Sequence, residues 1–530
     1  MSFGTHDQLV LLGLLALVGA LLVAAPAVRV PYPIFLVLGG LALGFVPGIP
    51  SLQLPPDIVL VAVLPPLLYS SAFFTSLREL RANARPIGLL SIGLVIATMC
   101  GVAAIAHAAI DGLSWSAAFV LGAVVSPTDP IAAVAIAQRL GVPRRIVAVV
   151  EGESLVNDGT ALVLYRVAVT AVVTASFSFW DASWRFVWNV VGGIAIGIVV
   201  GFLIAELRRR LDNPPLEVTI ALMTGYFAFI PANAAEASGV LAVVTAGIYL
   251  GWRTPELTSV QTRLQGVAVW EILVFVINAL LFALVGLQLS RILDALTGHS
   301  AGQLTWYALL VTGTVVVVRL AWVPVFTYLP RWLFGDAREQ HPAPPLSQPI
   351  VIAWSGMRGA VSLAAALALP LTTDVGTPFP QRDLIIFLTF CVILGTLVVQ
   401  GLSLPLVIRG FRLESDRLDE KEDAKARIHA AESALARLEE LVDEDWVRED
   451  TAERLRGLYN FRRSRFASRF DAEDDGAIEE RSLNYQRLRR ELLEAERSAI
   501  VGLRRSGVID DAVMRRLQRD LDLEDARLDV

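Results

Sequence analysis

Ser126-Pro127-Thr128-Asp129-Pro130 stands in the middle of an apolar segment that covers residues 115–138. A segment of this length and hydrophobicity is typical of a helix that crosses a membrane. Each proline, however, removes a backbone hydrogen-bond donor and clashes with the preceding helical turn. Irregular backbone at membrane depth is tolerated only against protein or a water-lined cavity. The stretch therefore predicts a membrane helix that breaks at Asp129 and resumes beyond it.

A second interruption of this kind lies near the end of the apolar part of the chain. Ser355-Gly356-Met357-Arg358-Gly359-Ala360-Val361-Ser362 places a charge among glycines within the apolar residues 348–370. Paired interrupted helices in corresponding positions of two halves are typical of inverted repeats with a binding site at the bilayer midplane. We expect the two breaks to cross, with Asp129 and Arg358 offsetting the partial charges of the half-helix ends. The alternative is a pair of kinks without function.

Apolar segments of about 17–25 residues, the length that crosses the hydrocarbon core, recur thirteen times in the first 410 residues. They lie near residues 8–28, 32–48, 55–75, 86–109, 115–138, 146–175, 186–207, 215–232, 236–251, 265–289, 304–329, 348–370 and 383–408. This pattern predicts an all-α polytopic membrane protein with about thirteen transmembrane helices in inverted repeats. We interpret the first segment as a retained span rather than a signal peptide, because no basic region precedes it.

Composition divides the chain into two parts. Hydrophobic residues make up 55% of the 530 residues, charged residues make up 18%, and the mean hydropathy is +0.59. Residues 411–530 nevertheless hold 24 of the 45 lysines and arginines and 31 of the 51 acidic residues. Their many Ala, Leu, Glu and Arg residues favour helices. We expect a transmembrane domain over residues 1–410 and a charged helical domain over residues 411–530, with no cofactor and no nucleic-acid partner.

Arginines are distributed unevenly between the loops that join the thirteen segments. If the first residue lies outside the cell, the inward loops carry fourteen arginines and the outward loops carry three. Cytoplasmic loops of membrane proteins carry an excess of Lys and Arg. The sequence thus predicts a multi-pass protein of the cell membrane with its N-terminus outside and its charged tail in the cytoplasm.

Three carboxylates lie close together in the sixth apolar segment, within Glu151-Gly152-Glu153-Ser154-Leu155-Val156-Asn157-Asp158-Gly159-Thr160. A carboxylate in hydrocarbon persists mainly where it meets water, an ion or a partner charge. Ser154, Asn157 and Asp158 fall on one helical face. We interpret Asp158 as the group that binds a cation or a proton, with Ser154 as an oxygen ligand and Asn157 orienting the carboxylate. The alternative is a buried polar cluster that only joins helices.

Glu153 lies on a neighbouring face of the same helix and needs a buried partner. Arg319, in the middle of an apolar run of valines, would also be unpaired in hydrocarbon. We therefore expect a buried ion pair between Glu153 and Arg319 with a structural role. Glu271 and Asn278 are further polar positions in an apolar span, and they fit packing as well as an ion path.

These motifs resemble those of the monovalent cation–proton antiporters of the NhaP/NHE type. The resemblance covers residues 8–410 and rests on the motifs at 128–130, 152–159 and 356–362. It implies a thirteen-helix inverted-repeat fold, a homodimer, and a core bundle that moves against a dimerisation scaffold. It implies a Na⁺ or K⁺ site at Asp158, Ser154 and Thr128, with Asn157 and Asp129 beside it. It also implies that Glu153 pairs with an arginine, best matched by Arg319, and that Arg358 steadies the crossover.

Two details bear on the transported ions. The Asn157-Asp158 pair resembles the electroneutral subgroup, since related electrogenic exchangers carry two aspartates there. Many prokaryotic members also carry a glutamate after the run Leu64-Pro65-Pro66-Leu67-Leu68-Tyr69, where this chain has Ser70. That departure leaves the choice between Na⁺ and K⁺ open.

The sequence thus predicts a secondary active antiporter, not an enzyme, that exchanges Na⁺ (or K⁺ or Li⁺) for H⁺ in a 1:1 ratio by alternating access. A K⁺/H⁺ antiporter of the same fold is one alternative. An intramembrane aspartyl protease using Asp129 and Asp158 is another, but the chain lacks the Gly-x-Gly-Asp motif of that class. A membrane sensor and a cation channel are weaker alternatives.

Overall fold

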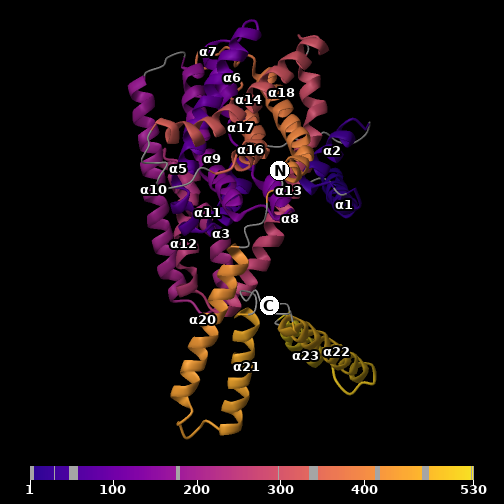
Figure 1. Cartoon of the computed structure of the whole chain (residues 1–530). Helices are drawn as coiled ribbons and strands as arrows, with labels where there is room; N and C mark the ends of the chain where they lie inside the picture. The colour runs from indigo at the N-terminus through magenta and orange to yellow at the C-terminus, as the bar shows by residue number, and fades with distance from the viewer. Residues whose placement is uncertain are drawn as a thin grey trace. The chain divides into compact units, whose positions relative to one another are not determined.

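The structure is a computed structural model that describes residues 5–28, 30–46, 58–174, 179–296, 298–333, 344–411, 413, 418–467, 477–526 and 528. Within these residues all regular secondary structure is helical, apart from one isolated bridge between Thr372 and Pro378. The chain forms two compact units, residues 1–415 and residues 416–530 (Figure 1). The division lies five residues beyond the predicted boundary of the transmembrane domain.

Each of the thirteen predicted apolar segments contains helix. The first six segments hold α1 (Thr5–Val28), α2 (Tyr32–Gly44), the π-helix η1 (Ile58–Val63) with α3 (Leu64–Phe74), α5 (Ala84–Gly88) with the π-helix η2 (Leu89–Leu94) and α6 (Val95–Ala109), α7 (Trp115–Val125) with α8 (Ile131–Arg139), and α9 (Arg144–Val173). The remaining segments hold α10 (Phe179–Arg209), α11 (Pro214–Ala234), α12 (Gly239–Leu257), α13 (Val260–Ala295), α14 (Ala301–Leu333), α16 (Ser347–Trp354) with α17 (Ala360–Leu367), and α18 (Arg382–Gly395) with the π-helix η3 (Thr396–Gln400) and α19 (Gly401–Gly410). The short α4 (Leu77–Ala82) joins α3 to α5.

Among the described residues, seven continuous helices are long and apolar enough to cross a membrane. Several other predicted spans are interrupted, so that no single helix in them reaches the required length. Helices suit this environment because they satisfy their backbone hydrogen bonds internally. The surface of α10 is apolar as well, with Trp184, Ile198 and Phe202 exposed, as expected of a helix that faces lipid or another apolar surface.

The two predicted interruptions are present, and they touch. Residues 126–130 separate α7 from α8, and residues 355–359 separate α16 from α17. The backbone N–H of Asp129 donates to the carbonyl of Met357 at 2.8 Å, which joins one break to the other. The prediction of two crossing interrupted helices is therefore confirmed.

Helix packing divides the first unit into two bundles. The crossover bundle contains α6, α7, α8, α9, α14, α16, α17, α18 and α19, and the flanking bundle contains α2, α3, α10, α11, α12 and α13. Within the flanking bundle α2 packs along α13, and α12 packs against α3, α10 and α11. Helix α9 also touches α3, α10 and α12, so the polar segment 151–160 lies where the bundles meet.

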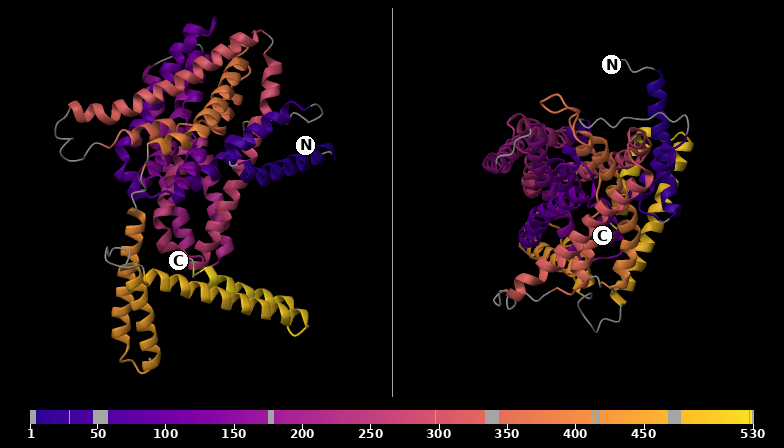
Figure 2. Two further views of the ribbon diagram at one scale, coloured as in Figure 1. Left: turned by 45° about the vertical axis from the view of Figure 1, so that its right-hand side comes forward. Right: turned by 90° about the horizontal axis from the view of Figure 1, so that it is seen from above.

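The second unit contains four described helices: α20 (Leu418–Leu441), α21 (Glu449–Ala467), α22 (Ala477–Arg505) and α23 (Asp511–Ala526). Figures 1 and 2 show α20 beside α21 and α22 beside α23 as two antiparallel pairs. Arg456 Nε donates to Glu439 at 2.8 Å across the first pair. Exposed ion pairs of this kind contribute little to stability.

Candidate ion site

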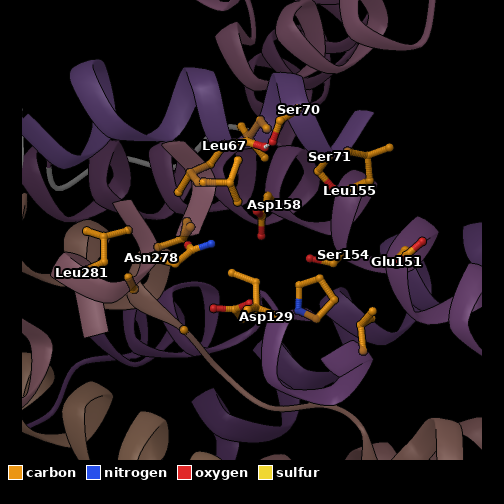
Figure 3. Close-up of a pocket in the computed structure, with 18 of the residues that line it drawn as sticks. Leu67, Ser70, Ser71, Asp129, Glu151, Ser154, Leu155, Asp158, Asn278 and Leu281 are labelled. Carbon is orange, nitrogen blue, oxygen red and sulfur yellow. Dashed lines mark hydrogen bonds between the residues drawn. The ribbon is translucent and has the colours of Figure 1, made fainter. Parts of the chain in front are cut away.

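A cavity of about 550 Å³ lies between the crossover bundle and the flanking bundle. Its walls come from α3, α8, α9, α13 and α17, and from the break at residues 127–130 (Figure 3). Glu151, Ser154 and Asp158 line it from α9, where their spacing places them on one face. The cavity reaches Thr75 and Gln138, at the ends of α3 and α8 that precede arginine-rich loops.

Asp158 is a buried carboxylate that lines this cavity, and 6% of its surface is exposed. Among the described residues, none donates a hydrogen bond to this carboxylate or forms an ion pair with it. Figure 3 shows its carboxylate between Ser154, Asp129 and Asn278. The Asp158 carboxylate is therefore available to bind a proton or a cation.

Ser154, one turn earlier on α9, lies beside Asp158. Its hydroxyl donates to the backbone carbonyl of Thr128 at 2.7 Å, which ties α9 to the first helix break. Because the hydroxyl proton is used in that bond, its lone pairs are left for a cation in the cavity.

A hydrogen bond joins Asn157 to Thr128 beside the cavity. The Asn157 amide does not line the cavity and is turned toward Thr128, whose Oγ1 accepts from Asn157 Nδ2 at 2.6 Å. The same hydroxyl donates to Glu153 Oε1 at 3.3 Å. Both side chains thus belong to one hydrogen-bonded network with Glu153, and Thr128 also lines the cavity.

Asp129 lies at the N-terminal ends of two half-helices. Its Oδ1 accepts from the backbone N–H of Ile131, at the start of α8, at 3.0 Å. Its carboxylate also lies against Gly359, the residue before α17, so closely that a Cβ at Gly359 would collide with it. A negative charge is favourable at helix N-termini, where backbone N–H groups point outward.

Arg358 lies at the C-terminal ends of the other two half-helices, α7 and α16. Its Nε donates to the carbonyl of Val125 at the end of α7 at 3.0 Å, and its Nη1 donates to the carbonyl of Gly356 just after α16. Only 1% of the side chain is exposed. A cation at these carbonyls offsets the partial negative charge of the C-termini, so Asp129 and Arg358 occupy complementary places in the crossover.

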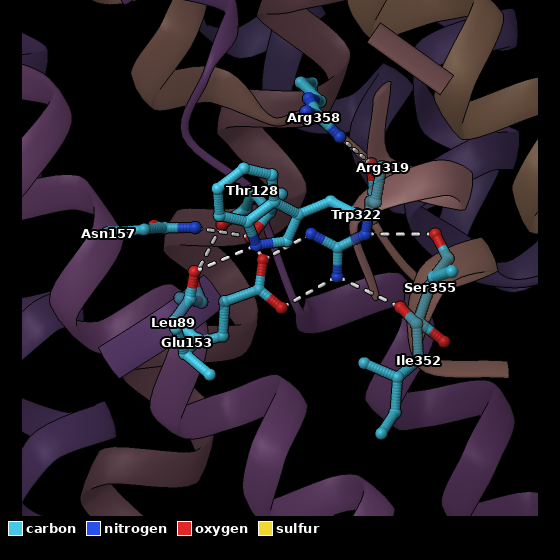
Figure 4. A network of polar contacts seen from close by, with 12 residues as sticks. Leu89, Thr128, Glu153, Asn157, Arg319, Trp322, Ile352, Ser355 and Arg358 are labelled. Atoms are coloured by element: carbon cyan, nitrogen blue, oxygen red, sulfur yellow. Dashed lines mark hydrogen bonds and ion pairs between the residues drawn. The ribbon is translucent and has the colours of Figure 1, made fainter. Parts of the chain in front are cut away.

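Glu153 and Arg319 form an ion pair in the crossover bundle (Figure 4), with 1% of each side chain exposed. Arg319 Nη1 contacts Glu153 Oε1, and Arg319 Nη2 donates to Glu153 Oε2 at 2.7 Å. Arg319 also donates to the carbonyls of Ile352 and Ala353, each at 3.0 Å. This two-point geometry with additional acceptors is the kind that compensates buried charges.

The flanking bundle contributes polar groups whose role the sequence left open. Asn278 on α13 is buried, lines the cavity and faces Asp158 in Figure 3. Glu271 lies seven residues earlier on α13, where it is exposed and lines the same cavity. Ser70 lines it from α3, and its hydroxyl donates to the carbonyl of Leu67 at 3.1 Å. The sequence signal that could have identified Asn278 as a cavity residue is its amide side chain within an apolar span.

Comparison with known proteins places this geometry in a family. A family model described as the transmembrane sodium/hydrogen exchanger matches residues 13–410. The chain is 40% identical over 506 residues to an uncharacterized Na⁺/H⁺ exchanger of Mycobacterium tuberculosis, covering 94% of this chain and 92% of that protein. It is 30% identical over 503 residues to the Na⁺/H⁺ antiporter ApNhaP of Aphanothece halophytica, covering 93% and 92% of the two chains.

Two further similarities concern the ions that a relative transports and the fold. The chain is 33% identical over 389 residues to a sodium, potassium, lithium and rubidium/H⁺ antiporter of Bacillus subtilis, which covers 71% of this chain and 58% of that protein. The sodium–proton antiporter MjNhaP1 of Methanocaldococcus jannaschii has the same fold, with a TM-score of 0.60 at 19% identity over 77% of this chain and 98% of that chain. From the helix crossover, the cavity and these matches, we conclude that the chain belongs to the sodium/hydrogen exchanger family.

Proposed function

We propose that the protein exchanges Na⁺ for H⁺ across the cell membrane and that Asp158 carries both ions in turn. The observation that supports this most strongly is the buried Asp158 carboxylate, which faces the cavity and has no hydrogen-bond or ion-pair partner in the part of the chain that the structure describes. A carboxyl group binds a proton in its neutral form and attracts a cation in its ionised form. Na⁺ and H⁺ therefore compete for one group, and binding of either displaces the other.

Transport by alternating access requires that Asp158 meet the two sides of the membrane in turn. The cavity separates the crossover bundle, which carries Asp158, from the flanking bundle, which carries Asn278. A rigid movement of one bundle against the other would close the present opening and expose Asp158 on the other side. With the N-terminus outside, the present opening faces the cytoplasm, and the state is inward-open.

The ion ligands we propose are the Asp158 carboxylate and the Ser154 hydroxyl, with Asp129 nearby. Thr128 and Asn157 act from behind them by fixing the first break against α9. Arg358 and Asp129 keep the crossover intact, and the Glu153–Arg319 pair holds the crossover bundle together. Ser70 and Asn278 line the cavity across from Asp158, and their side chains offer an ion only neutral oxygen and nitrogen atoms. Na⁺ is the first choice of substrate, and K⁺ is the alternative that the ion range of the Bacillus subtilis relative supports.

A preset pH gradient across proteoliposomes tests the activity. Its collapse on addition of Na⁺, K⁺ and Li⁺ in turn ranks the ions, and a gradient that survives all three would contradict the proposal. Collapse by K⁺ alone would favour the K⁺/H⁺ alternative. The aspartyl protease alternative is not supported, because the named relatives are exchangers and antiporters. The homodimer stays a prediction, and the exposed apolar face of α10 is consistent with it.

We expect exchange to be insensitive to the membrane potential. Asp158 carries one monovalent ion in each direction, and the other buried charges stay paired or at helix ends, so a cycle moves no net charge. An exchange that moved one charge would instead gain about 2.3 kcal/mol per 100 mV. Proton flux measured at several clamped potentials checks this expectation, and a steep dependence on potential would refute the 1:1 ratio.

A further inference from the structure

A second cavity, of about 310 Å³, lies between α5 and the crossover bundle and shares no lining residue with the cavity at Asp158. Its walls come from the ends of α5, α9, α14 and α16, and Arg85, Arg145 and Gln348 are its polar side chains with long reach. Trp322 and Phe326 line it from α14. Charged groups thus meet aromatic rings in one concave site.

The position of this cavity along the membrane-spanning helices is informative. Two of the seven candidate spans begin at Ala84 and Arg144, so Arg85 and Arg145 lie in the first turns of their spans. The span of α14 ends at Leu329, within two turns of Trp322 and Phe326. The cavity therefore lies at one end of three helices, at the level where lipid headgroups meet the hydrocarbon.

Positive charge is in excess around the cavity. Residues 78–85 and 144–145 contain five arginines and one acid, Glu79. Glu79 already pairs with Arg144 at 2.5 Å. Arg145 Nε donates only to the neutral Asn83 side chain at 3.3 Å, and Arg85 has no hydrogen bond or ion pair to another described residue. The two guanidinium groups that line the cavity thus lack a negative partner within the described residues.

The floor of the cavity is apolar. The Trp322 and Phe326 rings stack with centroids 3.9 Å apart. The indole N–H of Trp322 donates to the carbonyl of Leu89, in the π-helix η2, at 3.2 Å. Since this is the only polar hydrogen of the indole, the ring presents hydrocarbon to the cavity. A ligand that fits must be anionic at one end and apolar at the other.

We propose that this cavity binds an anionic phospholipid, with its phosphate between Arg85 and Arg145 and its glycerol and upper acyl carbons on Trp322 and Phe326. Arginine forms charge-assisted bonds with phosphate, and basic pockets between transmembrane helices recognise anionic headgroups. A small phosphate ester would satisfy the arginines and leave the aromatic floor bare.

Occupancy of the site is coupled to the buried ion pair. Ile352 lines the cavity, and its backbone carbonyl accepts from Arg319 Nη2. Trp322 lies three residues after Arg319 on the same helix. A lipid that spans α5, α9, α14 and α16 therefore braces the helices that hold Glu153 and Arg319, and it stabilises the crossover bundle.

The test uses the full chain in detergent, and its readouts do not require transport. We expect dioleoylphosphatidylglycerol to raise the Tm and to stay bound in native mass spectrometry, while dioleoylphosphatidylcholine and glycerol 3-phosphate do neither. The double variant Arg85→Gln/Arg145→Gln should lose both effects. Arg139→Gln is the matched control, because Arg139 is an exposed arginine at the end of α8 and does not line the cavity.

A second variant guards against loss of folding in the first. Phe326→Ala keeps both arginines and removes half of the aromatic floor, so it should weaken retention of the lipid. An equal Tm shift in the double variant would overturn the proposal, and so would an equal loss in Arg139→Gln. A full shift with glycerol 3-phosphate would identify a free phosphate site instead. These outcomes are independent of ion exchange, so failure here is distinguishable from failure of the proposed function.

Discussion

Asp158→Asn is expected to reduce cation–proton exchange to the rate of protein-free vesicles. Asparagine has nearly the same size, but it can neither bind a proton at neutral pH nor offer a negative charge to a cation. Because no described group forms a hydrogen bond or an ion pair with the Asp158 carboxylate, the substitution removes no such bond. The rate at which Na⁺ collapses a preset pH gradient in proteoliposomes measures the loss.

Glu151→Gln provides the matched control for this experiment. Glu151 lines the same cavity from the same face of α9, seven residues before Asp158, and the proposed mechanism assigns it no ion. We expect it to retain exchange. Elution as a single species and an unchanged Tm show that Asp158→Asn is folded, and wild-type exchange by that folded variant would reject the assignment.

Glu153→Gln is expected to lower the free energy of unfolding by about 3–5 kcal/mol, the usual cost of leaving one member of a buried ion pair uncompensated. Arg319 would keep its bonds to the carbonyls of Ile352 and Ala353 but would lose its only negative partner among the described residues. The fall in Tm in detergent and the shift of the denaturation midpoint measure this effect.

Two further variants interpret that result. Glu79→Gln removes one partner of Arg144 from a partly exposed pair, which should cost at most about 1 kcal/mol. The double variant Glu153→Gln/Arg319→Met should recover much of the stability, because it removes the uncompensated charge as well. If Glu153→Gln lowers the free energy of unfolding no more than Glu79→Gln does, the buried pair stabilises the fold no more than the surface pair.

The broken helices were predictable because proline and glycine act locally. Pro127 and Pro130 lack the donor that a continuous helix needs, and the break falls at residues 126–130. The partnership of Glu153 with Arg319 also follows from the cost of two lone charges in hydrocarbon. Such inferences depend on one or two residues and on the surrounding apolar sequence.

Other features depend on packing between distant segments. The turn of Asn157 toward Thr128, instead of toward the cavity, is set by how α9 meets the first break. The π-helices η2 and η3 contain no proline and no charged residue, so nothing local in them signals a wider turn. The second cavity brings together Arg85, Arg145 and Trp322 from three separate helices. None of these contacts has a local sequence signature.

The most direct test of Asp158 as a shared carrier is the release of protons when Na⁺ binds. The purified protein in weakly buffered detergent, with a pH indicator, reports this without any membrane. Competition at one carboxylate predicts that Na⁺ acidifies the solution by one proton for each cation bound, that lowering the pH weakens apparent Na⁺ affinity, and that Asp158→Asn releases none. Na⁺ binding without proton release in the wild-type protein, or equal release by Asp158→Asn, would contradict the account.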